Sequence, residues 1–272
     1  MVTGSKQDQL LGIHISDYSS THTLCIVPDA TGVYWCVSDD VGQIVSLGYR
    51  GLDPSNLSEI SVFASQLNGN HGFAKVVMGW HSDAYVLIPN ALYDFHSASD
   101  VLEMSTGIRS DSPLVFSNVR LGATMVADAN RDAIRSWEVA FPGCRTYPVA
   151  ACNVELVLGN NRFDRPPQIY IDLTNGRGHM IAYANKTVRL VNSFPIATKD
   201  ELLYYTANVC KQLQMDPSAC EVYLSGQVME GAKDLLYTYF KEVQLFQGFH
   251  DHLKAVVATH EFAAVLNIAA CA

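Results

Sequence analysis

The sequence predicts an α/β fold of two lobes, each built on a mixed β-sheet with flanking helices. Hydrophobic residues make up 49% of the 272 residues and charged residues 17%, which provides enough apolar material for a packed core. Short segments of strand character are interspersed with segments of helical periodicity along the chain. In addition, an order of three strands followed by a helix occurs twice, on either side of a polar segment.

In the first half, strands are expected in a meander at residues 12–16, 21–27 and 32–37, with a turn at 28–32. Apolar residues at helical spacing predict a helix over 54–67. The remaining expected strands lie at 73–80, 84–89, 112–120 and 123–129, and the remaining helices at 90–104, 130–141 and 148–159. The short apolar run of 148–159 leaves a strand open as the alternative.

The segment 160–168 is polar, contains two adjacent prolines and shows no periodicity, as is typical of a linker. We therefore expect one lobe over residues 1–163 and a second over 164–272. Strands are expected in the second lobe at 169–173, 178–184, 187–194, 220–226 and 241–247, and helices at 199–214, 229–240 and 252–270.

Two features of the second lobe carry more specific expectations. Thr198 and Glu201 have the spacing of a capping box, which predicts the start of the helix at 199. The last helix is too apolar to be left exposed, so it either packs back on the first lobe or forms a contact surface.

Five segments, in this order along the chain, resemble the actin-like ATPase superfamily and, more closely, a bacterial family of unknown function with that fold. They are "VLIPNALYD", "RSWEVAFPGC", "IYIDLTNG", "EVYLSG" and "THEFAAVLNIA". The resemblance implies a duplicated domain, with two RNase H-like lobes facing each other across a cleft. It also implies a relation in shape to the actin-like proteins of pilus assembly and cell division.

In ATP-binding members of that superfamily, both hairpins follow a D-x-G pattern and a third element ends in Gly-Gly. In this sequence the D-x-G of the first hairpin is replaced by His14 and Ser16. The second hairpin retains Asp172 but has Thr174 at the glycine position, and Gly226 is the one glycine that remains of the Gly-Gly pair. Mg²⁺ prefers oxygen ligands, so a histidine does not replace the carboxylate. No cofactor is therefore expected, and ATP–Mg²⁺ is disfavoured.

The resemblance nevertheless defines a candidate nucleotide-binding cleft that has lost its chemistry. Its residues would be Asp172, Thr174, Asn175, Gly176 and Gly226, with His14 and Ser16 opposite them. The alternative is that "TNGRG" forms only a hairpin, which is the interpretation that we prefer.

No catalytic residue and no metal ligand set is predicted. His250 and His252 are two residues apart and would point to opposite sides of a helix, and His260 is not part of an H-E-x-x-H motif. Ser225 lacks the G-x-S-x-G context of a nucleophile elbow, and the sequence has no P-loop.

Charge and cysteine content restrict the partners and the compartment. A net charge of -9, with 18 Lys and Arg residues that form no run, argues against nucleic acid. The absence of a signal peptide and of a spanning apolar run predicts a cytoplasmic protein without direct membrane insertion. Seven cysteines without a CxxC pair indicate reduced thiols.

These observations together favour a non-catalytic scaffold or adaptor that acts through protein–protein contacts, with the partner and the oligomeric state left open. The alternative is a nucleotide-binding ATPase, or a nucleotide-dependent switch that uses the cleft. Four tyrosines on expected helices are candidate interface anchors, although core packing also explains them. They are Tyr204, Tyr205, Tyr237 and Tyr239.

Overall fold

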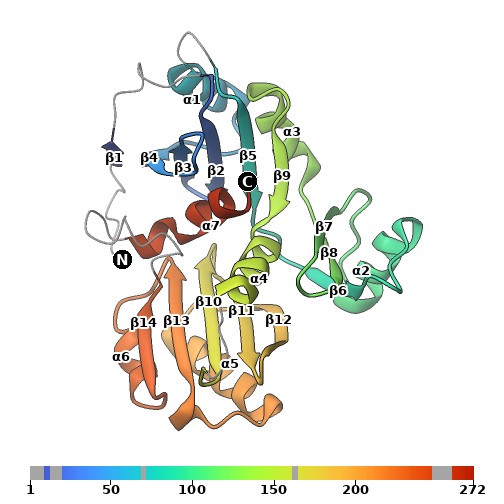
Figure 1. The fold of residues 1–272 in the computed structure, drawn as a ribbon, viewed down its shortest axis with the longest axis vertical. Helices are drawn as coiled ribbons and strands as arrows, with labels where there is room; N and C mark the ends of the chain where they lie inside the picture. The colour runs from blue at the N-terminus through green and yellow to red at the C-terminus, as the bar shows by residue number, and fades with distance from the viewer. Residues whose placement is uncertain (1–8, 13–19, 69–71, 161–164, 247–258) are drawn as a thin grey trace.

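The computed structural model describes residues 9–12, 20–68, 72–160, 165–246 and 259–272, and the structural statements below concern these residues. Two mixed sheets follow one another along the longest axis of the molecule (Figure 1). A three-stranded sheet with one helix projects from the side, close to the junction of the two lobes (Figure 1). The predicted α/β architecture of two sheet lobes is confirmed.

The first sheet contains six strands, with β2 near its centre. β2 pairs antiparallel with β3 and parallel with β5. In spatial order the strands are β1 (Gln9–Gly12), β4 (Ile44–Gly51), β3 (Gly32–Ser38), β2 (Thr23–Asp29), β5 (Lys75–Trp80) and β9 (Arg145–Pro148).

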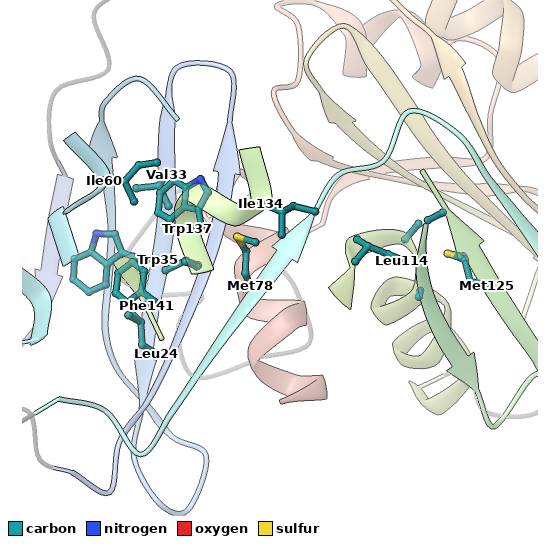
Figure 2. Close-up of a cluster of buried hydrophobic side chains, with 14 of the residues drawn as sticks. Leu24, Val33, Trp35, Ile60, Met78, Leu114, Met125, Ile134, Trp137 and Phe141 are labelled. Atoms are coloured by element: carbon teal, nitrogen blue, oxygen red, sulfur yellow. The ribbon is translucent and has the colours of Figure 1, made fainter. Parts of the chain in front are cut away.

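Apolar clusters cover both faces of this sheet. This explains why every residue of β2 between its polar ends, Thr23 and Asp29, is apolar. Leu24 and Ile26 belong to the cluster formed with α1 (Leu57–Asn68) and α3 (Arg131–Ala140) (Figure 2). The alternate residues Cys25 and Val27 pack in a different cluster, which contains α7 (Ala263–Cys271) and the start of α4 (Val149–Asn160). Successive side chains of a strand point to opposite faces, so β2 supplies both cores.

The second sheet has five strands and its own apolar core. Its strands are β12 (Thr187–Pro195), β11 (Arg177–Ala184), β10 (Gln168–Thr174), β13 (Glu221–Gly226) and β14 (Glu242–Leu245). Helices α5 (Lys199–Leu213) and α6 (Ala232–Tyr237) pack against it. The predicted capping box is present at the start of α5, where the Thr198 side chain accepts from the Glu201 N–H and the Glu201 side chain accepts from the Thr198 N–H.

The side projection is built from β6 (Tyr85–Pro89), β8 (Ala123–Ala127), β7 (Leu114–Asn118) and α2 (Ala98–Thr106). Short 3₁₀ turns lie at Phe95–Ser97, Pro217–Ala219 and Thr259–Phe262. The helix predicted from residue 90 therefore begins later, because Asp94 caps the 3₁₀ turn that precedes α2. The segment with the open assignment, 148–159, is the helix α4.

The two main sheets share one topology over five strands. The order β4-β3-β2-β5-β9 in the first lobe corresponds to β12-β11-β10-β13-β14 in the second. In each, the central strand is antiparallel to the next strand and parallel to the strand that follows the first helix. The strand that corresponds to β10 is therefore β2.

This topology corrects one sequence-based expectation. The strand predicted at 12–16 was matched to β10, which placed His14 opposite Asp172. That match is wrong, because β2 has the place and the pairing of β10, whereas β1 lies at the outer edge of the sheet, beside β4. The hairpin that corresponds to β10–β11 is β2–β3, with its turn at Ala30 and Thr31. His14 and Ser16 themselves lie outside the described residues.

The described part of the terminal helix, α7, packs on β2, β3, β5 and α4. Its residues Val265, Leu266 and Ile268 are fully buried, and so it is part of the core of the first lobe. The expected lobe boundary between 163 and 164 falls outside the described residues and stays a prediction. No helix in the described ranges is both long and apolar enough to cross a membrane.

Candidate interlobe site

The tips of the two corresponding hairpins meet between the lobes. The backbone N–H of Ala30, in the β2–β3 turn, donates to Oδ1 of Asn175, in the β10–β11 turn, at 3.1 Å. Asn175 and Gly176 both have positive φ, 50° and 73°, as a two-residue hairpin turn of this type requires. The glycine-rich turn therefore closes a hairpin, and its asparagine side chain contacts the other lobe.

Asp29 forms a second connection between the lobes. Its Oδ1 accepts from the N–H and the hydroxyl of Thr31, at 2.8 and 3.2 Å, which fixes the turn. Its Oδ2 accepts from Nε2 of Gln227, which follows β13, at 3.2 Å. This buried carboxylate was not predicted as a site residue, although its position at the end of a strand before Ala-Thr-Gly was a signal for it.

Asp172 lies in β10 and is 6% exposed. Its Oδ1 accepts from the hydroxyl of Ser225 at 2.8 Å. Its Oδ2 has no hydrogen-bond partner among the described residues and lies 3.9 Å from Nδ1 of His81, which follows β5 of the first lobe. The carboxylate is therefore between the serine and the histidine, so this is not the relay of a hydrolase triad, in which histidine contacts the serine.

Two histidines and a tyrosine fill the space beside Asp172. The rings of His81 and His179 are 5.5 Å apart, and the hydroxyl of Tyr85 lies 3.5 Å from Nδ1 of His179. Burial lowers the pKa of His81, and the charge of Asp172 partly opposes this. Burial also lowers the pKa of His179, assisted by His81 and Arg177. Both imidazoles are therefore neutral near pH 7, and a neutral ring fits a buried contact between lobes.

Gly226 has a structural role at the end of β13. Its φ is 76°, and a Cβ at this position would collide with the carbonyl oxygen of Leu173. The same carbonyl accepts from the N–H of Gln227 at 2.7 Å. Gly226, the glycine that remains of the third ATP-binding element, thus lets β13 approach β10 closely.

The predicted site residues of the second lobe do come together at its lobe-facing end. Asp172 and Thr174 are buried on β10, Asn175 and Gly176 form the adjoining turn, and Gly226 contacts Leu173. The other residues of the predicted cleft, His14 and Ser16, lie outside the described residues, as do His250 and His252, for which no metal site is predicted. Within the described ranges, no three His, Cys, Asp or Glu side chains gather in a way that could hold a metal ion.

The space left between the hairpins is small. One cavity of about 150 Å³ is lined by residues of both lobes, among them Asp29, Trp80, His81 and Asn175. A second, of about 20 Å³, is lined by Asp172, His179, Ser225 and Asn267 with others. Sites for cofactors and drug-sized ligands usually have roughly 300–1,000 Å³, so both cavities are smaller than a typical site of this kind.

The fold is that of the actin-like ATPases. A protein from Bacteroides thetaiotaomicron with an actin-like ATPase fold and unknown function aligns with a TM-score of 0.71 and 16% identity, over 84% of this chain and 91% of that one. The PilM–PilN type IV pilus biogenesis complex aligns with a TM-score of 0.60 and 13% identity, over 92% and 98%. The inorganic polyphosphate/ATP-glucomannokinase of Arthrobacter sp. strain KM aligns with a TM-score of 0.52 and 9% identity, over 92% and 97%.

Within this fold, the chain belongs to the DUF3822 family, which is described as a family of proteins of unknown function. The family model matches residues 15–243. No curated protein sequence matches the chain. Because the structural relatives are less than 25% identical, they define the fold and not the activity.

Proposed function

We propose that this protein is a non-catalytic member of the actin-like fold that acts as a scaffold or adaptor through protein–protein contacts. The observation that supports this most strongly is the contact between the hairpin tips, where Ala30 donates to Asn175. In a nucleotide-binding cleft, backbone N–H groups of this kind are left available for phosphate oxygens. Here the N–H is already satisfied by the opposite lobe.

The composition of the cleft supports the same proposal. Asp29 is occupied by Thr31 and Gln227, Oδ1 of Asp172 by the Ser225 hydroxyl, and Oδ2 of Asp172 faces the neutral imidazole ring of His81. Mg²⁺ retains several waters and needs room for them, whereas the cavity beside Asp172 has about 20 Å³, the space of a single water.

Exposed aromatic side chains on the second lobe support a role in contacts with a protein. Tyr204 of α5, Tyr237 of α6 and Tyr239 are 64%, 57% and 56% exposed, whereas Tyr205 is half-buried and stacks on Phe194. Tyrosines are enriched in interfaces because they combine a large apolar surface with a polar end. The similarity to PilM, which is found in a complex with PilN, is consistent with this role by analogy.

The cytoplasm is the compartment we propose. All seven cysteines are free, although six of them lie close to another cysteine, and reduced thiols of this kind are typical of a reducing compartment.

The rival function is a nucleotide-dependent switch. It rests on Asp172, whose Oδ2 faces the interlobe space without a hydrogen-bond partner among the described residues and would gain one from a water bound to Mg²⁺. Opening of the hairpin contact would then have to precede binding.

Phosphate release from ATP by the purified full chain separates the two functions. We expect no release above that of buffer, with or without Mg²⁺. Release that Asp172→Ala abolishes, and that the exposed-site control Asn185→Ala retains, would establish the rival.

A further inference from the structure

Six of the seven cysteines lie in contacting pairs, although none is part of a sequence motif. The Cys25 thiol raises the pKa of Cys36, the Cys271 thiol raises the pKa of Cys152, and the Cys210 thiol raises the pKa of Cys220, which places the members of each pair beside each other. Five of these six side chains are buried, and Cys271 is the partly exposed one. A reagent in solution can therefore reach the Cys152–Cys271 pair through Cys271.

The packing of α4 against α7 holds these two thiols together. The Cys271 thiol donates to the backbone carbonyl of Cys152 at 3.7 Å. One turn earlier on α7, Nδ2 of Asn267 donates to Oδ1 of Asn153 at 2.9 Å. Two neighbouring polar contacts thus fix the register of the helices at this point and hold the Cys271 side chain against Cys152.

The two thiols differ in acidity in a way that suits thiol–disulfide exchange. The neighbouring Cys152 thiol lowers the pKa of Cys271, a shift that burial and Glu155 partly oppose and Arg120 assists, while the Cys271 thiol raises the pKa of Cys152. Cys144 is also partly exposed, but burial raises its pKa to about 12. Because the thiolate is the nucleophile, Cys271 is the cysteine that combines access with reactivity.

We propose that Cys271 is a site of reversible S-thiolation by low-molecular-weight disulfides, and that Cys152 resolves the adduct to a Cys152–Cys271 disulfide. The Cys271 thiolate attacks one sulfur of the disulfide RSSR, forms a mixed disulfide and releases RS⁻, which takes up a proton. Cys152 then loses its proton, attacks the Cys271 sulfur and releases the second RS⁻. Two protein thiols are oxidised, and RSSR is reduced to two RSH.

The product would fasten α7 to α4 through a bond between residues 119 positions apart. The same two helices contribute Asn153 and Asn267 to the lining of the small interlobe cavity. The crosslink therefore restrains the junction of the two lobes, and it also restricts the unfolded chain, so the oxidised protein should be the more stable form.

The test treats the native full chain with oxidised glutathione and maps its peptides without reduction. We expect a peptide that joins Cys152 to Cys271, a higher melting temperature and reversal of both by a thiol reductant. In Cys152→Ser the glutathione adduct should persist on Cys271, whereas Cys144→Ser should behave like the wild type.

Wild-type mapping decides the proposal even if a variant fails to fold. The proposal is overturned if Cys271 remains reduced while Cys144 reacts, or if glutathione remains on Cys271 in the wild type without forming the crosslink. Crosslinking through a buried pair, before any reaction at Cys271, would contradict it as well.

Discussion

Asn175 combines two functions in one side chain at the tip of the β10–β11 hairpin. Its φ of 50° is left-handed, a conformation that asparagine tolerates better than most residues, and its Oδ1 accepts from Ala30 of the other lobe. Asn185 has a similar φ of 53° in the next turn of the same sheet and is also exposed. A comparison of substitutions at Asn175 and Asn185 therefore distinguishes the energetic cost of the turn conformation from the energy of the contact between the lobes.

We expect Asn175→Ala to destabilise the protein more than Asn185→Ala does. Both variants lose the preference for positive φ, but only Asn175→Ala removes the bond from Ala30, worth about 0.5–1.5 kcal/mol. Urea unfolding of the two variants measures the difference. Equal losses would show that the hairpin contact contributes nothing.

Single residues of the interlobe site were only partly predictable. Asp172 was found because it sits in a strand next to a glycine-rich turn. His81, His179 and Tyr85 were missed because each lies in an apolar segment without a motif, and the fold alone brings them together from two lobes. Asp29 was missed because the strand expected at 12–16, and not the strand that ends at Asp29, was matched to β10.

At the scale of elements, the approach of β13 to β10 depends on one residue. Gly226 has φ 76° and no room for a Cβ, because the Leu173 carbonyl lies there. Gly176 has φ 73° but open space around the position of a Cβ. The two glycines therefore share a backbone conformation and differ in packing.

Gly176→Ala should cost about 1–2 kcal/mol, the penalty of a left-handed conformation for an L-residue. Gly226→Ala should cost clearly more, because β13 must also move away from β10. Denaturant unfolding monitored by circular dichroism compares the two. If Gly226→Ala proved as mild as Gly176→Ala, the close approach of the strands would not be needed for stability.

Elements with a strong local signal were predicted well, as the capping box at Thr198 and the strand-turn-strand around Asn175 illustrate. The strand Ile44–Gly51 was missed because Gly48 and Gly51 interrupt its apolar pattern, and glycine is rare inside strands. The strand Arg145–Pro148 is too short to show a period, and its pairing with β5 is a long-range contact. Such pairings depend on tertiary structure that a local pattern does not contain.

At the scale of the whole molecule, the contact between lobes contains buried groups that titrate. His81 and His179 have lowered pKa values, and the groups around them are Asp172, Asp29, Tyr85 and Arg177. The two histidines are neutral in the folded protein, whereas in the unfolded chain they bind protons from about pH 6.5 downward. Folding is therefore linked to pH through this contact.

The contribution of these two histidines to the free energy of unfolding should be constant above about pH 6.5. Below that pH it should fall, because the unfolded state then binds more protons than the folded state. His179→Gln should weaken this dependence, and His96→Gln, at an exposed position, should leave it unchanged. Urea titrations between pH 5 and 8 at constant ionic strength measure it. Stability that rises on acidification through this range would contradict neutral buried histidines.

Our central proposal is that the lobes, which meet through their own hairpins, bind no nucleotide between them. The most direct test is a thermal-shift titration of the full chain with ATP and Mg²⁺, because a ligand of the folded state raises the melting temperature with its concentration. We predict no shift at any nucleotide concentration. A saturable rise of several degrees that disappears in Asp172→Ala would contradict the account.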